Sequence, residues 1–143
     1  MGRGRHALPL ARAGFRVFGV DINPDAVRDA VAGARGEGLR LLAWCADLTR
    51  HPLPIARFDL IVISRYLQRG LFPDLKAAAA AHGVVLYETF MTAQRALGSG
   101  PSSPDHLLEP GELRRRFDDW DVLFYEETFE PEAVARLAAR RRS

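Results

Sequence analysis

Two glycines and an acid open the chain at a spacing that suits nucleotide binding. Gly2 and Gly4 frame a turn, where glycine permits positive φ and a close approach of the backbone to a ligand. The helical segment that follows begins with amide donors that favour negative charge. Asp21 comes seventeen positions after Gly4, at the end of "FRVFGVD", where a carboxylate can accept hydrogen bonds from ribose hydroxyls. The alternatives are a flexible terminus for the glycines and helix capping for Asp21.

A second acid ends the next strand-like segment. Asp47 in "WCADLTR" can accept a hydrogen bond from the exocyclic amine of a base, and its neighbours Ala46 and Leu48 offer backbone and apolar contact to the ring. Taken alone, Asp47 is an ordinary polar residue at a strand end. Together with the glycine turn and Asp21, it favours a ligand that contains a nucleoside.

Polar residues also follow two later strand-like segments. Ser64 and its two successors stand where "FDLIVIS" ends, which is where the reactive end of a cofactor would meet a substrate. Glu88 and Thr89 in "GVVLYETF" are candidates to face the same cleft, whereas Tyr87 and Phe90 are expected in the core.

The elements that must position these residues alternate between strand and helix patterns. Strands are expected over residues 15–21, 39–47, 58–64 and 83–90, and helices over residues 5–14, 23–38 and 72–82. Asn23 is the expected cap of the second helix, with Pro24 at its first position. The rest of the chain predicts a surface loop over 98–106, a short helix within 109–119, and an antiparallel pair of strands over 120–129 and 133–141.

This alternation predicts an α/β fold with a doubly wound, mostly parallel Rossmann-like sheet and a C-terminal antiparallel strand pair. The length of 143 residues predicts one domain over residues 1–143. In such sheets, ligands bind beyond the carboxyl ends of the strands, and each motif above falls at such an end.

Composition bounds the class of protein. The 48% hydrophobic and 27% charged content is that of a globular chain, and no apolar run approaches the roughly 20 residues that cross a bilayer. One cysteine, Cys45, excludes an internal disulfide and suits a reducing compartment, so a cytoplasmic location is expected. The net charge of +2 and short arginine runs without interleaved aromatic residues argue against nucleic acid as a partner. The four histidines lack metal-ligand spacing, so no metal site is indicated.

In order and spacing, these segments resemble class I S-adenosylmethionine-dependent methyltransferases along nearly the whole chain. "GRGRHALPLARAGFRVFGVDINPDAV" resembles the second half of the family's first motif with its acidic strand end. "CADL" resembles the adenine-contacting segment, and "FDLIVISRYLQRGLFPDL" resembles the fourth strand and its exit. "YETF", "SSPDHLLEPGELRRRF" and "VLFYEE" are similar to a bacterial subgroup, the tellurite-resistance methyltransferases.

The resemblance implies S-adenosylmethionine as the cofactor and a small molecule as the methyl acceptor, and it identifies no catalytic residue. Asp21 would hold the ribose, Ile22 would pack on adenine, and Asp47 would meet the adenine amine. The glycines and Ser64, or neighbours of Ser64, would line the methionine side. With the neighbours of Asp47 included, the expected cofactor-binding residues are Gly2, Gly4, Asp21, Ile22, Ala46, Asp47, Leu48 and Ser64.

One departure from the family bears on the fold. Family members have a first, central strand before the point at which this chain starts. Without that strand, segments 15–21 and 58–64 would each have an unpaired edge, so we expect a truncated chain with impaired methyl transfer. The other possibility is that these two strands pair directly in a smaller sheet.

Two other functions stay open. A fragment of an NAD-binding oxidoreductase would use the glycine turn and the acid equally well, although His6 and Ala7 stand where its third fingerprint glycine belongs. A non-catalytic methyltransferase-like fragment is the second.

Overall fold

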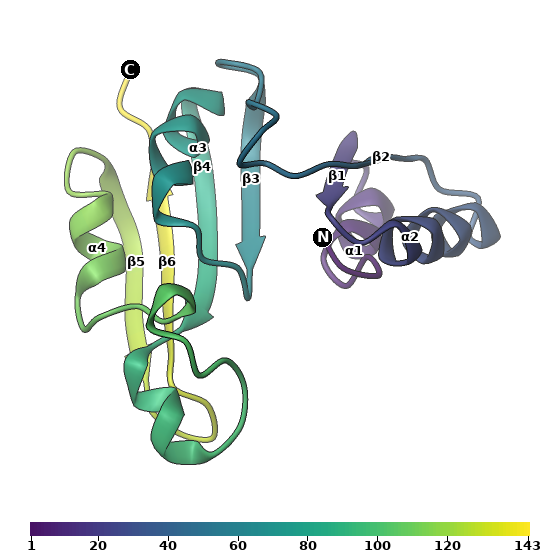
Figure 1. Ribbon diagram of the computed structural model, residues 1–143. Coiled ribbons are helices and arrows are strands. Elements are labelled where there is room, and N and C mark those ends of the chain that lie inside the picture. The colour runs from purple at the N-terminus through teal and green to yellow at the C-terminus, as the bar shows by residue number, and fades with distance from the viewer. The chain divides into compact units, whose positions relative to one another are not determined.

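The strands divide between two sheets in the computed structural model, which describes residues 1–143 (Figure 1). One sheet pairs β1 (Val17–Asp21) with β2 (Leu41–Cys45). The other has the order β3 (Phe58–Ser64), β4 (Ala79–Phe90), β6 (Val134–Arg140) and β5 (Asp121–Thr128). The sheets belong to two compact units, Met1–His51 and Pro52–Ser143, called unit 1 and unit 2 below. The expected single sheet is therefore wrong, whereas one domain over residues 1–143 stays a prediction.

Unit 1 contains two helices whose boundaries follow from local chemistry. α1 (Ala7–Arg12) is followed by Gly14, whose φ of +91° ends the helical path. α2 (Pro24–Gly36) begins at Asn23, whose side chain accepts hydrogen bonds from two amides of the first turn. Both predicted helices, and the predicted cap, are confirmed.

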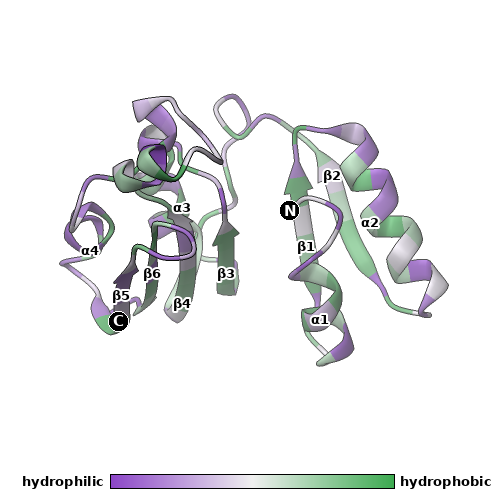
Figure 2. Ribbon diagram, turned by 90° about the horizontal axis from the view of Figure 1, so that it is seen from below, coloured by the Kyte–Doolittle hydropathy of each residue, from purple (hydrophilic) through white to green (hydrophobic).

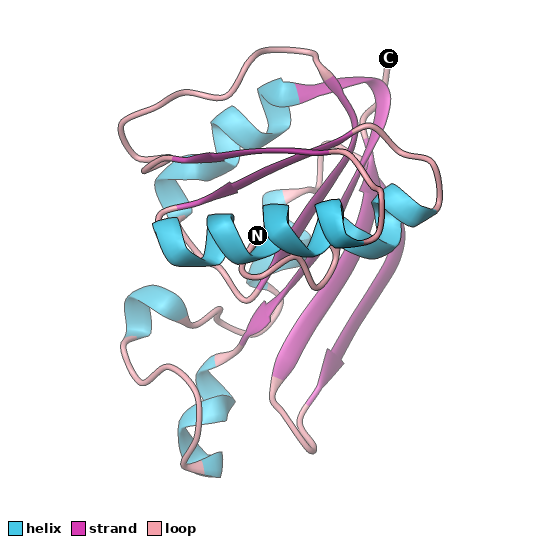
Figure 3. Cartoon of the chain, turned by 90° about the vertical axis from the view of Figure 1, so that its right-hand side faces the viewer, coloured by secondary structure: helices cyan, strands magenta, loops and turns pink.

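The core of unit 1 is made of small and branched side chains. Its buried members are Ala7, Val17, Ala30, Ala34 and Leu41. Hydrophobic and hydrophilic residues alternate around α2 (Figure 2), and the helix lies alongside the strands of its own unit (Figure 3). The small residues bring backbone close to backbone, and the turn before α1 therefore packs directly onto the helices.

Unit 2 mixes parallel and antiparallel pairing. β3 pairs with β4 in parallel, whereas β6 pairs antiparallel with both β4 and β5. The predicted C-terminal antiparallel pair is confirmed, and a cis Glu130–Pro131 bond lies in the turn that joins it. With β1 and β2 parallel, two of the four pairings are parallel. The chain therefore has one parallel two-stranded sheet and one mixed four-stranded sheet in place of the expected mostly parallel one.

The helix predicted over residues 72–82 ends early. α3 spans Phe72–Ala78, and β4 begins at Ala79, so the prediction is wrong for its last four residues. Backbone amides of the segment before β3 take the carbonyls that would continue the helix: Ala56 N donates to Ala77 O at 2.8 Å and Arg57 N to Ala78 O at 2.9 Å. Pairing with another segment here outweighs the helix propensity of an alanine run.

Aromatic side chains build the core of unit 2. Phe72 of α3 stacks on Tyr87 of β4 with ring centroids 5.6 Å apart, and it meets Phe117 edge-on at 6.0 Å. Phe117 in turn meets Trp120 at 5.4 Å. Tyr87 and Phe90 are buried, as predicted. In β3, Ile63 is the single buried residue.

Short elements complete unit 2. The 3₁₀ helices are η1 (Arg69–Leu71), η2 (Thr92–Leu97) and η3 (Pro104–His106), and the last α-helix is α4 (Glu112–Arg116). Lys76 of α3 forms an ion pair with Asp119 and donates to Arg116 O at 3.1 Å, which ties α3 to the end of α4. No helix in the chain combines the length and apolar character that a membrane crossing requires.

β1 and β3 each have one neighbour in their sheets. β1 pairs with β2 alone, and β3 pairs with β4 alone. Each of these strands therefore lies at an edge of its sheet. Direct pairing between the two strands is wrong, because they belong to different sheets.

Candidate functional site

The parallel register of unit 1 brings the two predicted acidic strand ends together. Asp21 pairs with Cys45 at the last position of both strands. Ala46 N then donates to Asp21 O at 3.1 Å, so Asp47 lies two residues beyond the point where the strands end. The two carboxylates therefore belong to one edge of the sheet, as the sequence predicts.

Asp21 is the most heavily hydrogen-bonded group at this edge. Its Oδ2 accepts from Gly2 N at 2.6 Å and from the Met1 amino group at 3.1 Å, and its Oδ1 accepts from Asn23 N at 2.9 Å. Partial burial acts to raise the pKa of Asp21, but the hydrogen bonds from Asn23, Gly2 and the amino group outweigh it, so the pKa lies below its ordinary value. Asp21 is therefore an ionised acceptor that also fixes the glycine turn.

The two glycines of the turn have different surroundings. Gly2 has a φ of +58°, and a Cβ built there meets nothing within 4 Å. Gly4 has a φ of +93° and is buried; a Cβ there would lie 3.2 Å from Leu8 Cγ and 3.4 Å from Ala30 Cβ. Gly2 therefore leaves open space beside the carboxylate of Asp21, whereas Gly4 allows the turn to pack on α1 and α2.

Asp47 holds the turn after β2. Its Oδ1 accepts from Thr49 N at 2.9 Å and from Thr49 Oγ1 at 2.7 Å, while Oδ2 lies 3.8 Å from Arg50 Nε. The hydrogen bonds from the Thr49 hydroxyl and amide lower the pKa of Asp47. One oxygen of this carboxylate thus has no hydrogen bond among these contacts.

Apolar surface lies beside these acids. Ile22 is 68% exposed, which is high for an isoleucine next to a strand end. Its carbonyl accepts from the exposed Cys45 thiol at 3.3 Å. Ala46 and Leu48 are half-buried. Unit 1 thus brings six of the eight predicted cofactor-binding residues to one edge, with Gly4 packed beneath the turn.

Ser64, the eighth predicted residue, belongs to unit 2, at the carboxyl end of β3. The next residue, Arg65, has a φ of +53°, and its amide donates to Glu88 O at 2.8 Å. Its guanidinium pairs with Glu132 Oε2 at 2.9 Å and lies 5.2 Å from the centre of the Phe90 ring. A non-glycine residue in this conformation is held there by its surroundings.

The two residues predicted to face a cleft from β4 point to opposite faces of the sheet. Glu88 forms an ion pair with Arg136 of β6 at 2.7 Å, and Arg136 also reaches Glu126 of β5 at 3.1 Å. Thr89 is buried. Because successive side chains of a strand alternate, both cannot share one face, and the prediction for Thr89 is wrong.

One charged pair in unit 2 is not predicted by the sequence. Arg69 of η1 and Glu112 of α4 form a two-armed ion pair, with Nε–Oε1 and Nη2–Oε2 distances of 2.8 Å each. Burial acts to raise the pKa of Glu112, but hydrogen bonds from Arg69, Glu109 N and Arg116 lower it to about 2. The partners are 43 positions apart in sequence, so no local pattern connects them.

Comparisons with known proteins identify the family and the fold of this chain. The methyltransferase domain family matches residues 1–86. Hemagglutinin 1 of Eikenella corrodens is 33% identical, over 88% of this chain and 43% of that protein. TehB from Haemophilus influenzae superposes with a TM-score of 0.83 at 20% identity, over 99% of this chain and 55% of TehB. For an S-adenosylmethionine-dependent methyltransferase from Mesorhizobium loti the TM-score is 0.79 at 18% identity, over 98% of this chain and 87% of the other.

A TehB-like S-adenosylmethionine-dependent methyltransferase from Corynebacterium glutamicum has a TM-score of 0.70 at 16% identity, over 99% of this chain and 76% of that one. The chain thus spans about half the length of TehB and less than half of Hemagglutinin 1. Its fold is that of the class I S-adenosylmethionine-dependent methyltransferases, and by the match over residues 1–86 it belongs to the methyltransferase domain family.

Proposed function

We propose that the chain binds S-adenosylmethionine at the carboxyl ends of β1 and β2 and takes part in methyl transfer to a small acceptor. One observation carries the proposal. The parallel register brings Asp21 and Asp47 to a single edge, and each carboxylate keeps room for a further donor.

The contacts of Asp21 leave capacity for a ribose. A carboxylate has about four lone-pair sites, and three protein donors use sites here, two on Oδ2 and one on Oδ1. A ribose hydroxyl can therefore donate to Oδ1. The open space at Gly2 lies beside the same carboxylate, because the Gly2 amide donates to it.

The contacts of Asp47 leave capacity for an amine. Both hydrogen bonds go to Oδ1, which leaves Oδ2 to accept from the adenine amine. The exposed Ile22 side chain offers apolar surface to the adenine ring. The residues present thus fit an adenosine moiety.

S-adenosylmethionine, when bound, supplies an electrophilic methyl group on a sulfonium for in-line displacement. The chain has to hold and orient the methyl donor and the acceptor, because their proximity accounts for much of the acceleration of such a reaction. In unit 1, Asp21 would hold the ribose and Asp47 the base. We expect slow transfer by this chain alone, since Gly4 is committed to packing and Gly2 alone of the two glycines borders open space.

Isothermal titration with S-adenosylhomocysteine and, in parallel, with NAD tests the cofactor. The proposal expects heat with the first and none with the second. Heat with NAD alone would favour an oxidoreductase fragment. No heat with either ligand at high protein concentration would favour a non-catalytic fragment.

The exposed Cys45 provides a second readout. Its thiol contacts the Ile22 carbonyl, so bound ligand should slow its alkylation by a maleimide. NAD at the same concentration is the control. The acceptor is then sought by measuring S-adenosylhomocysteine formation with a thiol, a phenol and a metalloid oxyanion.

A further inference from the structure

The two-stranded sheet of unit 1 packs against helices on one of its two faces. Val17 and Leu41 belong to the core that this face forms with α1 and α2. Successive side chains of a strand alternate between faces, so Phe18 and Leu42, the next residues along the two strands, belong to the opposite face. This second face, called the open face below, consists of Arg16, Phe18, Val20, Arg40, Leu42 and Trp44.

Two aromatic side chains of the open face are partly exposed. The exposed fraction is 43% for Phe18 and 38% for Trp44. Phe18 pairs with Leu42, so Trp44 lies two positions further along the neighbouring strand. The spacing of strands and the rise per residue separate the Cα atoms of Phe18 and Trp44 by about 8 Å. Exposed rings on the face of a sheet are surfaces on which unstacked nucleobases can stack.

Two arginines of the open face carry positive charge that no acid of the chain pairs with. Arg16 and Arg40 directly precede β1 and β2, and neither guanidinium forms an ion pair. The arginines of unit 1 that form ion pairs are Arg3, Arg12, Arg28 and Arg50. Unit 1 has eight arginines against five acids, so its net charge is +3 with neutral histidines. This charge complements a polyanion.

Arg16 also enlarges the surface available for stacking. Its guanidinium carbon lies 5.1 Å from the centre of the Phe18 ring, which is a cation–π contact. The guanidinium is planar and has several donors, so it can stack on a base and donate to a phosphate. One end of the open face thus combines both modes of binding a nucleotide.

The pairing of β1 with β2 creates this combination. The sequence argues against nucleic acid as a partner because the arginine runs at residues 114–116 and 140–142 lack interleaved aromatic residues. Arg16 and Arg40 lie outside those runs. The register brings their strands together, with Phe18 on one and Trp44 on the other.

We propose that the open face of unit 1 binds single-stranded nucleic acid. Bases stack on Phe18 and Trp44, and phosphates lie at Arg16 and Arg40. Stacking accepts any base, so little sequence preference is expected, and a duplex binds more weakly because its bases are already stacked. The inference goes beyond the proposed function and does not rest on it.

Titration of the full chain with an oligothymidylate of about ten nucleotides tests the proposal. Trp44 is exposed and Trp120 is buried, so a stacked base should quench the fluorescence of Trp44. We expect a dissociation constant of about 10⁻⁵ M at low salt. Absence of binding at about ten times that concentration overturns the proposal, as does equal affinity for a duplex of the same length.

A conservative variant identifies the tryptophan that reports binding. Trp44→Phe keeps a ring on the open face, so the anisotropy of a labelled oligothymidylate should show affinity within about threefold of the wild type. The quenching of tryptophan fluorescence should disappear. Quenching that persists in Trp44→Phe would come from Trp120 of unit 2 and overturns the proposal.

Removal of each ring tests stacking directly. Phe18→Ala and Trp44→Ala should each raise the dissociation constant about tenfold, because stacking of one base is lost. Phe129→Ala removes an exposed ring of unit 2, is the matched control, and should leave affinity unchanged. Equal affinity in all three variants overturns the proposal.

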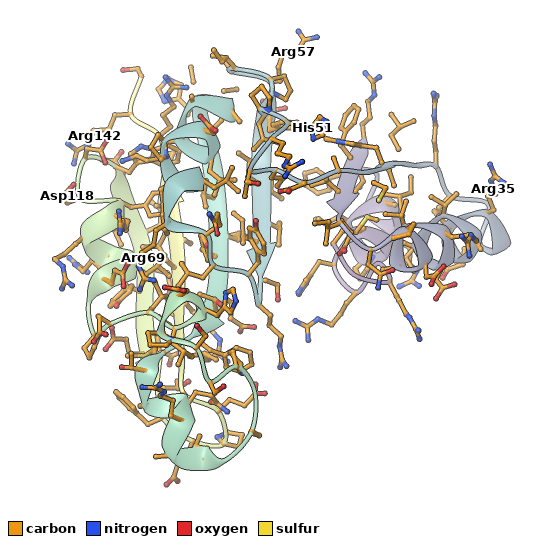
Figure 4. All side chains as sticks on the ribbon, in the orientation of Figure 1. Arg35, His51, Arg57, Arg69, Asp118 and Arg142 are labelled. Carbon is orange, nitrogen blue, oxygen red and sulfur yellow. The ribbon has the colours of Figure 1, made fainter.

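A charge variant covers the case in which the ring variants fail to fold. Arg40→Gln should lower the slope of log K against log salt by about 0.7, the value for one phosphate contact on a single strand. Arg35, at the end of α2 (Figure 4), is exposed and forms no ion pair, so Arg35→Gln is the matched control and should keep the slope. Equal slopes in both variants overturn the proposal.

Sedimentation separates nucleic acid from another occupant of the open face. A dimer that forms at high protein concentration and is lost in Trp44→Ala would assign the face to a second copy of the chain and overturn the proposal. Thymine lacks the exocyclic amine proposed to meet Asp47, and no methyl transfer is measured. A negative result therefore leaves the proposed function untouched, and absence of S-adenosylhomocysteine binding leaves this inference untouched.

Discussion

Unit 1 and unit 2 use polar groups in opposite ways. In unit 1, the two carboxylates at the strand edge keep acceptor sites that no hydrogen bond from the protein fills, and the Oδ2 of Asp47 has only the ion pair with Arg50 at 3.8 Å. In unit 2, Arg69 and Glu112 meet protein partners on every side, and the core around them is aromatic. Unfilled hydrogen-bonding capacity marks where a ligand can bind. Hydrogen-bonding capacity that protein partners fill marks groups that stabilise the fold.

The largest expected effect tests whether the aromatic cluster stabilises unit 2. Phe117→Ala removes a fully buried ring that contacts Phe72 and Trp120, so the free energy of unfolding of unit 2 should fall by about 3–5 kcal/mol. Denaturant unfolding followed by tryptophan fluorescence measures it. Phe129→Ala removes a half-exposed ring from the same unit and should change it by about 0.5 kcal/mol at most. Equal losses for both would remove the contrast between core and surface.

The next-largest effect tests the Arg69–Glu112 ion pair of unit 2 through the pH dependence of the free energy of unfolding. The pKa of Glu112 is about 2 in the folded chain against an ordinary 4.5, so its ionised form stabilises the fold above pH 4.5. That contribution is lost as the pH falls from about 4.5 toward 2. Glu112→Gln should cost about 2–3 kcal/mol of unfolding free energy at pH 7 and progressively less below pH 4.5. A loss that is the same at pH 3 and pH 7 would contradict the assignment.

A smaller effect tests whether the unfilled acceptor site of Asp21 in unit 1 binds a ligand. Asp21→Asn replaces an acceptor-only group by one with a donor, so the dissociation constant for S-adenosylhomocysteine should rise about tenfold, or 1.4 kcal/mol. Titration calorimetry measures it. Asp25→Asn makes the same change in an exposed ion pair on α2 and should leave affinity unchanged. If both variants bind alike, the carboxylate of Asp21 serves only the glycine turn.

The smallest effect separates capping from binding at the same edge. Asn23→Ala removes the acceptor for the amides of Asp25 and Ala26, and unit 1 should lose about 1 kcal/mol of unfolding free energy. Asn23→Ser should restore most of it. Thermal unfolding followed by circular dichroism measures both. A weaker affinity for S-adenosylhomocysteine in the stable Asn23→Ser variant would show that capping and binding are coupled.

Local chemistry predicted the elements of unit 1 closely. Asn23 and Pro24 set the start of α2, and branched residues followed by an acid set the end of β1. These signals act between residues a few positions apart, so they can be recognised in a single sequence. The same reasoning extended α3 too far, because the carbonyls of Ala77 and Ala78 are taken by a segment that lies about twenty positions earlier.

The residues of the candidate site also differ in how well the sequence predicts their positions and roles. Strand-end acids are visible in sequence, and the parallel register of β1 and β2 brings Asp21 and Asp47 together as expected. The roles of Gly2 and Gly4 were not separable, since both have positive φ and differ only in what surrounds them. The Arg69–Glu112 pair was out of reach, because long-range pairing of two charged residues leaves no trace in the spacing of either.

The single thiol and the single lysine of the chain also make it convenient to label. Cys45 lies in unit 1 and Lys76 in unit 2, so a maleimide dye and, once the Met1 amino group has been blocked, an ester dye can each be attached to one unit without mutation. Fluorescence energy transfer between the two dyes would then measure the separation of the units in solution, molecule by molecule.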